Sequence, residues 1–152
     1  AKLIQQVARA ADRIGKTVQG IRNYIYRDDD AFEEAIPLSE ILDSVLLFCG
    51  QRLANHGIEF RKVNTEGVLL RGYKGQLEQA VLNLVNNSFD AVSGLQEKWI
   101  EVSAVLEGDL VDLYFKDSGH GIPVDLRSKI MEPFFSTKKA SGTGLGLPVV
   151  QK

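Results

Sequence analysis

Apolar residues recur at every seventh position through the first part of the chain, residues 1–27. They form three series: Leu3, Ala10, Thr17 and Tyr24; Val7, Ile14 and Ile21; and Ile4, Ala11, Val18 and Ile25. The pattern predicts a long helix with a broad apolar stripe, which suits a helical bundle better than a two-stranded coiled coil. An ordinary amphipathic helix packed on its own domain is the alternative. The charged stretch RDDDAFEEAIP, which ends at Pro37, is interpreted as a linker.

From residue 38 onward the pattern changes to shorter elements. It predicts an amphipathic helix over residues 38–56, capped by Ser39 and ended at Gly57, and then short strands Ile58–Val63 and Val68–Gly72 with NTEG as the turn between them. A helix over residues 75–93 is expected next, followed by a hairpin of Trp99–Leu106 and Leu110–Lys116 around EGD. A short helical stretch near residues 124–131 and the start of a last helix complete the prediction. Helices and antiparallel strands in this order predict an α+β fold, a two-layer α/β sandwich.

The helix predicted over residues 75–93 has two unlike faces. At about 100° per residue its polar positions fall within about 80° of arc: Gln76, Gln79, Asn83, Asn87 and Asp90. The opposite side is apolar and is expected to pack on a sheet: Leu77, Ala80, Val81, Leu84, Val85, Ala91 and Val92. Asparagine is a poor helix former, whereas a merely solvated face ordinarily carries Lys, Glu and Arg. Amide oxygens suit Mg²⁺, which combines few protein ligands with phosphate and water; a polar face of no consequence is the alternative.

Composition narrows the possible classes of protein. The length of 152 residues fits one domain, or one domain with an appendage, and 44% hydrophobic residues allow a real core. A net charge of −2 argues against a nucleic-acid partner, and the single cysteine, Cys49, excludes a disulfide framework and suits a reducing cytosol. No signal peptide opens the chain, and no apolar run approaches about 18 residues. Because both ends fall abruptly within patterned segments, a piece of a longer protein is expected, which leaves a membrane anchor elsewhere open.

A carboxylate and two glycines follow the last predicted strand in the motif KDSGHGIP. Asp117 comes directly before the turn that contains Gly119 and Gly121. Glycine lets the backbone turn sharply and approach a flat ligand, and a carboxylate at a strand end can accept a hydrogen bond from an exocyclic amine such as that of adenine. A plain turn is the alternative.

A second glycine motif, SGTGLGLP, places Gly142, Gly144 and Gly146 at alternate positions before an apolar helix start. Backbone N–H groups there can wrap a polyphosphate, with Thr143, Lys138 and Lys139 adding a hydroxyl and positive charge. The spacing matches neither the P-loop nor the dinucleotide fingerprint. The segment EPFFSTK joins the two glycine motifs, and its two phenylalanines suit either a loop anchor or an ordinary core.

These motifs occur together in a recognisable order. The chain has Asn87 four residues after Asn83, and then DSGHGIP, EPFFSTK and GTGLGLP. In this order the motifs resemble the ATP-binding domain of bacterial sensor histidine kinases, which has the Bergerat fold. The resemblance implies that residues 31–152 are an ATP-binding catalytic domain, truncated at its C-terminal end. It implies that residues 1–30 are the truncated second helix of a dimerisation bundle.

The resemblance also implies roles for individual residues. Asn87 would coordinate Mg²⁺, Asp117 would bind the adenine amine, and Phe134 would lie with Phe135 at the base of a lid over ATP. The implied nucleotide-binding residues are Asn83, Asn87, Asp90, Asp117, Gly119, Gly121, Ile122, Phe134, Thr137, Lys138, Gly142, Thr143, Gly144, Leu145 and Gly146. The implied cofactors are ATP and Mg²⁺.

The implied activity is that of a protein histidine kinase in two-component signal transduction, which donates the γ-phosphate to a histidine on a dimerisation helix. The ATPase branches of the fold resemble one another in having, at the position of Asn83, a glutamate that acts as general base on water. Asparagine cannot take this role, which favours phosphoryl transfer to a protein over hydrolysis of ATP. Only His56 and His120 are present, and neither has the context of the acceptor, which is therefore expected upstream of Ala1. The implied partners are a second copy, through the bundle of the full-length protein, and a response regulator, and the domain is expected in the cytoplasm.

Three alternatives stay open at this point. The first is an ATP hydrolase of the same fold, against which Asn83 argues. The second is a serine/threonine kinase of the same fold, against which the bundle-like first segment argues. The third is an interaction module that has lost ATP binding, against which the intact glycine motifs argue.

Overall fold

The computed structural model describes residues 31–137, 144 and 146–150. Contacts divide the chain into two compact units, Asp30–Ile122 and a second one that includes Pro123–Lys152. The long helix predicted over residues 1–27 lies outside the described residues, so its place in a bundle stays a prediction.

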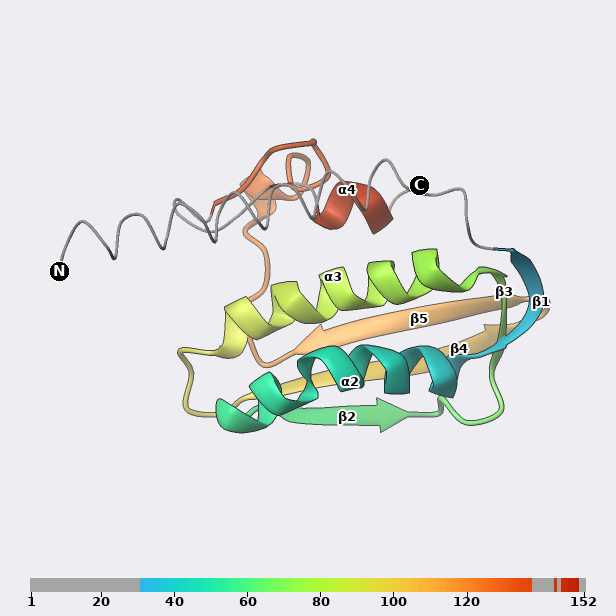
Figure 1. The fold of residues 1–152 in the computed structure, drawn as a ribbon. Helices are drawn as coiled ribbons and strands as arrows, with labels where there is room; N and C mark the ends of the chain where they lie inside the picture. The colour runs from blue at the N-terminus through green and yellow to red at the C-terminus, as the bar shows by residue number, and fades with distance from the viewer. Residues whose placement is uncertain (1–30, 138–143, 145, 151–152) are drawn as a thin grey trace, which may run out of the picture. The chain divides into compact units, whose positions relative to one another are not determined.

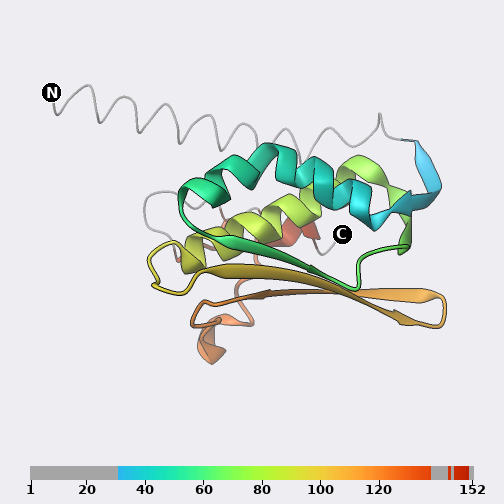
Figure 2. The same ribbon diagram turned by 90° about the horizontal axis from the view of Figure 1, so that it is seen from below.

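The unit Asp30–Ile122 has two layers, a pair of helices and a sheet. The sheet has the order β2-β4-β5, with β2 (Glu59–Val63) parallel to β4 (Trp99–Glu107) and β5 (Leu110–Asp117) antiparallel to β4. Helices α2 (Leu38–Asn55) and α3 (Lys74–Val92) lie side by side over one face of this sheet (Figures 1 and 2). The predicted two-layer sandwich and the predicted β4–β5 hairpin are confirmed. The expectation of antiparallel strands is wrong for β2, because α3 carries the chain back across the sheet before β4 begins.

The segment interpreted as a linker is partly a strand. Strand β1 (Phe32–Pro37) pairs antiparallel with β3 (Leu69–Tyr73) in a separate two-stranded sheet. Ile36 in β1 is fully buried, so a partner distant in sequence supplies both the backbone pairing and the apolar contact that outweigh the local charge. The two strands predicted around NTEG exist, but they belong to different sheets and do not pair with each other.

Helix α2 begins without the predicted cap. Pro37 occupies the N-cap position with no side-chain hydrogen bond, and Ser39 lies inside the helix, so its assignment as the cap is wrong. The backbone N–H of Leu38 donates instead to the Val68 carbonyl at 2.9 Å, and the Leu38 side chain is fully buried. A contact between segments far apart in sequence thus gives the Leu38 N–H, one of the unpaired amides at the start of the helix, its hydrogen-bond acceptor. Gly57, at φ +66°, follows the helix end as predicted.

The core lies between the two helices and the three-stranded sheet. Its members are Leu38, Ile41, Leu42, Val45, Cys49 and Leu53 of α2, Val81, Val85 and Val92 of α3, and Ile100, Val102 and Ala104 of β4, with Ile36, Ile58 and Val68 around them. Burial of side chains of this size stabilises the fold by about 1.5–3 kcal/mol each. This burial fixes the rotation of α3, because its valines must face the sheet and its amides therefore point elsewhere.

The second unit contains little regular structure among its described residues. A 3₁₀ helix, η1, covers Val124–Leu126, and helix α4 covers Gly146–Val150. The helical stretch predicted near residues 124–131 is therefore a 3₁₀ turn followed by further turns. The predicted start of a last helix is confirmed at Gly146.

Candidate functional site

The polar stripe of α3 faces away from the core. Asn83 and Asn87 are half-buried and Asp90 is exposed, whereas Val81 and Val85 on the other side are buried. The Nε2 of Gln79 donates a hydrogen bond to Oδ1 of Asn83 at 2.9 Å, one helical turn further on. The amides thus occupy a protected but accessible surface, as the helical spacing predicts.

The motif after β5 is held in place by Asp117 and Gly119. Asp117 is the last residue of β5 and pairs with Ile100 in β4. Its Oδ1 accepts a hydrogen bond from the Gly119 N–H at 2.9 Å. A methyl group added at Gly119 would lie 2.7 Å from that same Oδ1 and 3.1 Å from the Cβ of Ala91. A side chain at position 119 would require Asp117 or Ala91 to shift, so glycine suits a turn that lies this close to the C-terminal part of α3.

The structure therefore brings two of the predicted groups together. The turn at Gly119 lies against α3 at Ala91, directly after Asp90, and the N–H of Gly119 holds the carboxylate of Asp117. Gly121, at φ +75°, and Ile122 complete the turn and are exposed. The expectation that Ala91 packs on the sheet is wrong: it is exposed to solvent and borders Gly119. Sequence patterning missed this contact, because a small residue next to a helical apolar face looks like one more core position.

The remaining predicted residues belong to the second unit, where Phe134 and Gly144 form a backbone pair. The Phe134 N–H donates to the Gly144 carbonyl at 2.8 Å. Both residues have positive φ, 69° for Phe134 and 66° for Gly144, and the Phe134 side chain is 74% exposed. A methyl group on Gly144 would lie 2.3 Å from the carbonyl carbon of Phe134. The pair thus ties EPFFSTK to the second glycine motif.

The structure describes two of the other predicted residues of this unit and leaves four outside the described part. Thr137 is exposed, and Gly146 opens α4. Lys138, Gly142, Thr143 and Leu145 lie outside the described residues.

A comparison with known families shows to which family the chain belongs. The family described as "Histidine kinase-, DNA gyrase B-, and HSP90-like ATPase" matches residues 72–152, a range that contains α3, the Asp117 turn and both glycine motifs. The chain belongs to this ATPase family. Membership implies nucleotide binding, and the relatives below place the chain among the sensor histidine kinases of the family.

Two curated relatives and one solved structure illustrate the likeness. The chain is 37% identical over 125 residues to the two-component sensor PprA of Pseudomonas aeruginosa, which covers 76% of this chain and 14% of the relative. It is 32% identical over 150 residues to the sensor histidine kinase ZraS of Escherichia coli, covering 98% of this chain and 31% of the relative. The catalytic domain of the histidine kinase ThkA matches with a TM-score of 0.67 at 28% identity, covering 78% of each chain.

A second ThkA structure, in complex with the response regulator protein TrrA, matches with a TM-score of 0.72 at 24% identity, covering 90% of this chain and 40% of that one. At that identity the likeness concerns the fold. The chain spans less than a third of the length of PprA or ZraS. None of the helices in the described part of the chain combines the length and apolar character that crossing a membrane requires.

The two histidines of this ATPase-family chain differ in their surroundings. His56 follows the end of α2, where its Nδ1 lies 2.9 Å from the Arg52 carbonyl oxygen. Its ring packs edge-to-face on Phe89 with the ring centroids 4.9 Å apart. These contacts give His56 a structural role at the α2–α3 junction. His120 is exposed in the turn between Gly119 and Gly121.

Proposed function

We propose that this chain binds Mg-ATP and is the ATP-binding catalytic part of a sensor histidine kinase. In the longer protein it donates the γ-phosphate to a histidine on a dimerisation helix, outside residues 1–152. One observation supports this most strongly: the turn that carries Asp117 is seated on the same helix that carries the amide stripe. A base-reading carboxylate and a phosphate-facing amide row then belong to the same compact unit, Asp30–Ile122.

The carboxylate of Asp117 is suited to read adenine. Gly119 occupies one lone pair of Oδ1 through its N–H. A carboxylate has about four acceptor sites, so Oδ2 can accept a hydrogen bond from the exocyclic amine of the base. The missing side chain at Gly119 lets the turn lie close to Ala91, so that Asp117 is held beside α3.

The donor set of α3 fits a magnesium ion held largely by the nucleotide. The described residues contain no group of three His, Cys, Asp or Glu side chains arranged to hold a metal. Mg²⁺ in phosphate sites typically takes one or two protein oxygens and fills its shell with phosphate oxygens and water. We assign the protein oxygen to the amide of Asn87, with Asn83 one turn before it on the same face. When bound, Mg²⁺ neutralises charge on the phosphate oxygens.

The same helix favours transfer to a protein over hydrolysis. A hydrolase needs a base that takes a proton from water, and the amide of Asn83 cannot do so at neutral pH. The Asn83 oxygen already accepts a hydrogen bond from Gln79 at 2.9 Å. The chain's contribution is therefore to hold the nucleotide, to keep the γ-phosphate in line with an incoming histidine nitrogen, and to exclude water.

Partners follow from this activity. We propose that the longer protein forms a homodimer through its helical bundle and passes the phosphoryl group to a response regulator. The ThkA–TrrA complex supports a regulator as the partner class through its likeness in fold.

The proposal is tested by incubating this chain with Mg-ATP labelled at the γ-phosphate. We expect saturable binding, slow release of inorganic phosphate, and no acid-labile phosphate on His56 or His120. In the longer protein we expect acid-labile phosphohistidine on the bundle. Fast phosphate release by this chain alone would favour an ATP hydrolase. Absence of any Mg-ATP binding would favour a module that has lost nucleotide binding.

Replacing Gly144 with alanine is expected to lower ATP affinity by about tenfold or more, because the new methyl group cannot lie 2.3 Å from the Phe134 carbonyl carbon and the backbone pair must open. Isothermal titration with Mg-ATP measures the effect. Gly94→Ala is the matched control, since a methyl group there meets no atom within 4 Å. Equal affinities of Gly144→Ala and Gly94→Ala would contradict a role of the pair in the site.

A further inference from the structure

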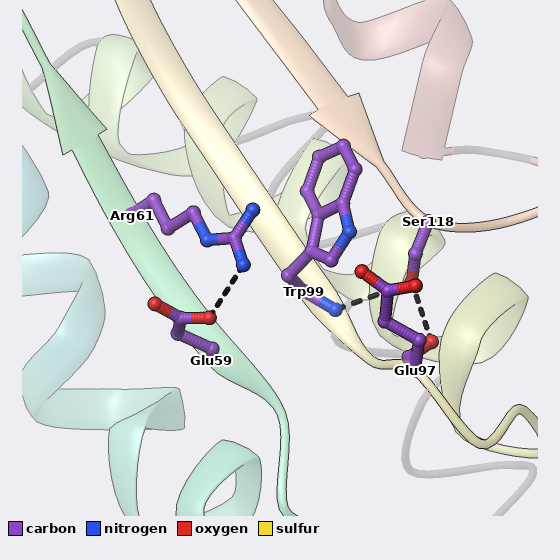
Figure 3. Close-up of polar contacts among 5 residues, drawn as sticks. All are labelled: Glu59, Arg61, Glu97, Trp99 and Ser118. Carbon is purple, nitrogen blue, oxygen red and sulfur yellow. Dashed lines mark hydrogen bonds and ion pairs between the residues drawn. The ribbon is translucent and has the colours of Figure 1, made fainter.

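Ser118 forms hydrogen bonds to the start of β4 at the point where β5 ends and the Asp117 turn begins. Its hydroxyl takes part in two hydrogen bonds, accepting from the Trp99 N–H at 3.2 Å and donating to the Glu97 carbonyl at 2.9 Å. Its own N–H donates to the Trp99 carbonyl at 3.1 Å. Figure 3 shows the hydroxyl lying between the first residue of β4 and the loop before it.

The hydroxyl takes the place of a backbone acceptor. Ile100 and Asp117 are the last paired residues of the β4–β5 ladder, so Trp99 and Ser118 are next in register. In a regular antiparallel ladder such a pair exchanges two N–H to carbonyl bonds. Here the Ser118 N–H makes one of them and its side chain accepts the other. The chain can therefore leave the sheet directly after Asp117 without leaving the Trp99 N–H unpaired.

Trp99 also contacts the neighbouring strand β2 through its indole ring. The Arg61 guanidinium lies over the indole ring, 4.9 Å from its centroid. Arg61 also forms an ion pair with Glu59 at 2.6 Å, and both residues belong to β2, the strand next to β4. Figure 3 shows this contact on β2 beside the Trp99–Ser118 pair. The end of β5 is thus tied through β4 to β2.

We propose that Ser118 is a positioning residue for base recognition. It fixes the backbone of Asp117 so that the carboxylate faces the exocyclic amine of adenine, with Gly119 fixing the carboxylate rotation. This inference rests on the proposed function, because it assumes that Asp117 reads the base. Ser118 itself has no contact with the nucleotide in this proposal.

The test compares ATP with inosine triphosphate, in which a carbonyl at C6 replaces the amine. We expect the parent chain to prefer ATP by about tenfold or more, since a carboxylate repels that carbonyl. Ser118→Ala is expected to lose about tenfold in ATP affinity and little in inosine triphosphate affinity, so that the preference nearly disappears. Ser118→Thr, which keeps the hydroxyl, is expected to restore the preference to within about twofold.

Matched controls separate positioning from a general loss of stability. Ser103→Ala removes a hydroxyl from the middle of β4 and is expected to leave the preference unchanged. Emission from Trp99, the single tryptophan, together with circular dichroism shows that each variant is folded during titration. If Ser118→Ala does not fold, Ser118→Cys carries the same expectation, because a thiol is a weak donor and acceptor.

The outcomes distinguish this inference from the proposed function. An unchanged preference in folded Ser118→Ala or Ser118→Cys overturns the role of Ser118 and leaves nucleotide binding intact. Equal affinity of the parent chain for the two nucleotides overturns the assignment of Asp117 to adenine, and with it this inference. A parent chain that binds neither nucleotide overturns the proposed function itself.

Discussion

Asp117→Asn is expected to reverse the base preference of the nucleotide site. ATP affinity should fall by about 10- to 100-fold, because a hydrogen bond to a charged acceptor is worth about 1.5–3 kcal/mol and the new amide points an N–H₂ at the adenine amine. The same N–H₂ can donate to the C6 carbonyl of inosine triphosphate, whose affinity should rise. The Asn oxygen can still accept from the Gly119 N–H, so the turn is expected to persist.

Calorimetric titration of both nucleotides measures this reversal. Asp112→Asn is the matched control, since Asp112 is an exposed carboxylate on the same strand and faces away from the turn. It is expected to behave like the parent chain. Unchanged ATP affinity in Asp117→Asn would show that the base is read elsewhere.

Asn87→Ala is expected to remove the dependence of ATP binding on magnesium. With Mg²⁺ present the affinity should fall by about tenfold or more, whereas affinity measured in excess EDTA should change little, because the lost amide oxygen serves the metal. Comparing the two conditions within one variant cancels any general weakening of α3.

Asn86→Ala provides the neighbouring control. The Asn86 amide oxygen accepts a hydrogen bond from the Arg52 guanidinium on α2, so its side chain serves the contact between the helices. It is expected to lower thermal stability slightly and to keep the magnesium dependence. Retention of that dependence in Asn87→Ala would sink the assignment of the metal ligand.

Local pattern was a good guide wherever one element's own residues decide its structure. The bounds of α3 differ from the prediction by one residue, because its apolar and amide faces are both set by helical periodicity. The β4–β5 hairpin was likewise predictable, since alternation on both strands brackets a turn with Gly108 at φ +62°.

The predictions from sequence were wrong where a segment far away in the chain determines the local structure. Strand β1 carries the charges of a linker and becomes a strand only by pairing with β3. The start of α2 is served by the Val68 carbonyl rather than by Ser39, and β2 pairs in parallel with β4 rather than with its neighbour in sequence. Each of these outcomes depends on a contact between segments far apart in the chain, about which local propensity carries no information.

The sequence by itself determined which chemistry is present: an amide row at helical spacing, a carboxylate before two glycines, and a second glycine motif, in an order typical of one family. Only the tertiary structure decided that the Asp117 turn rests on α3 at Ala91 and that Ser118 ties it to β4. The physical reason is that residue types and spacing set what a side chain can bind. The packing of sheet and helix sets which of those side chains meet.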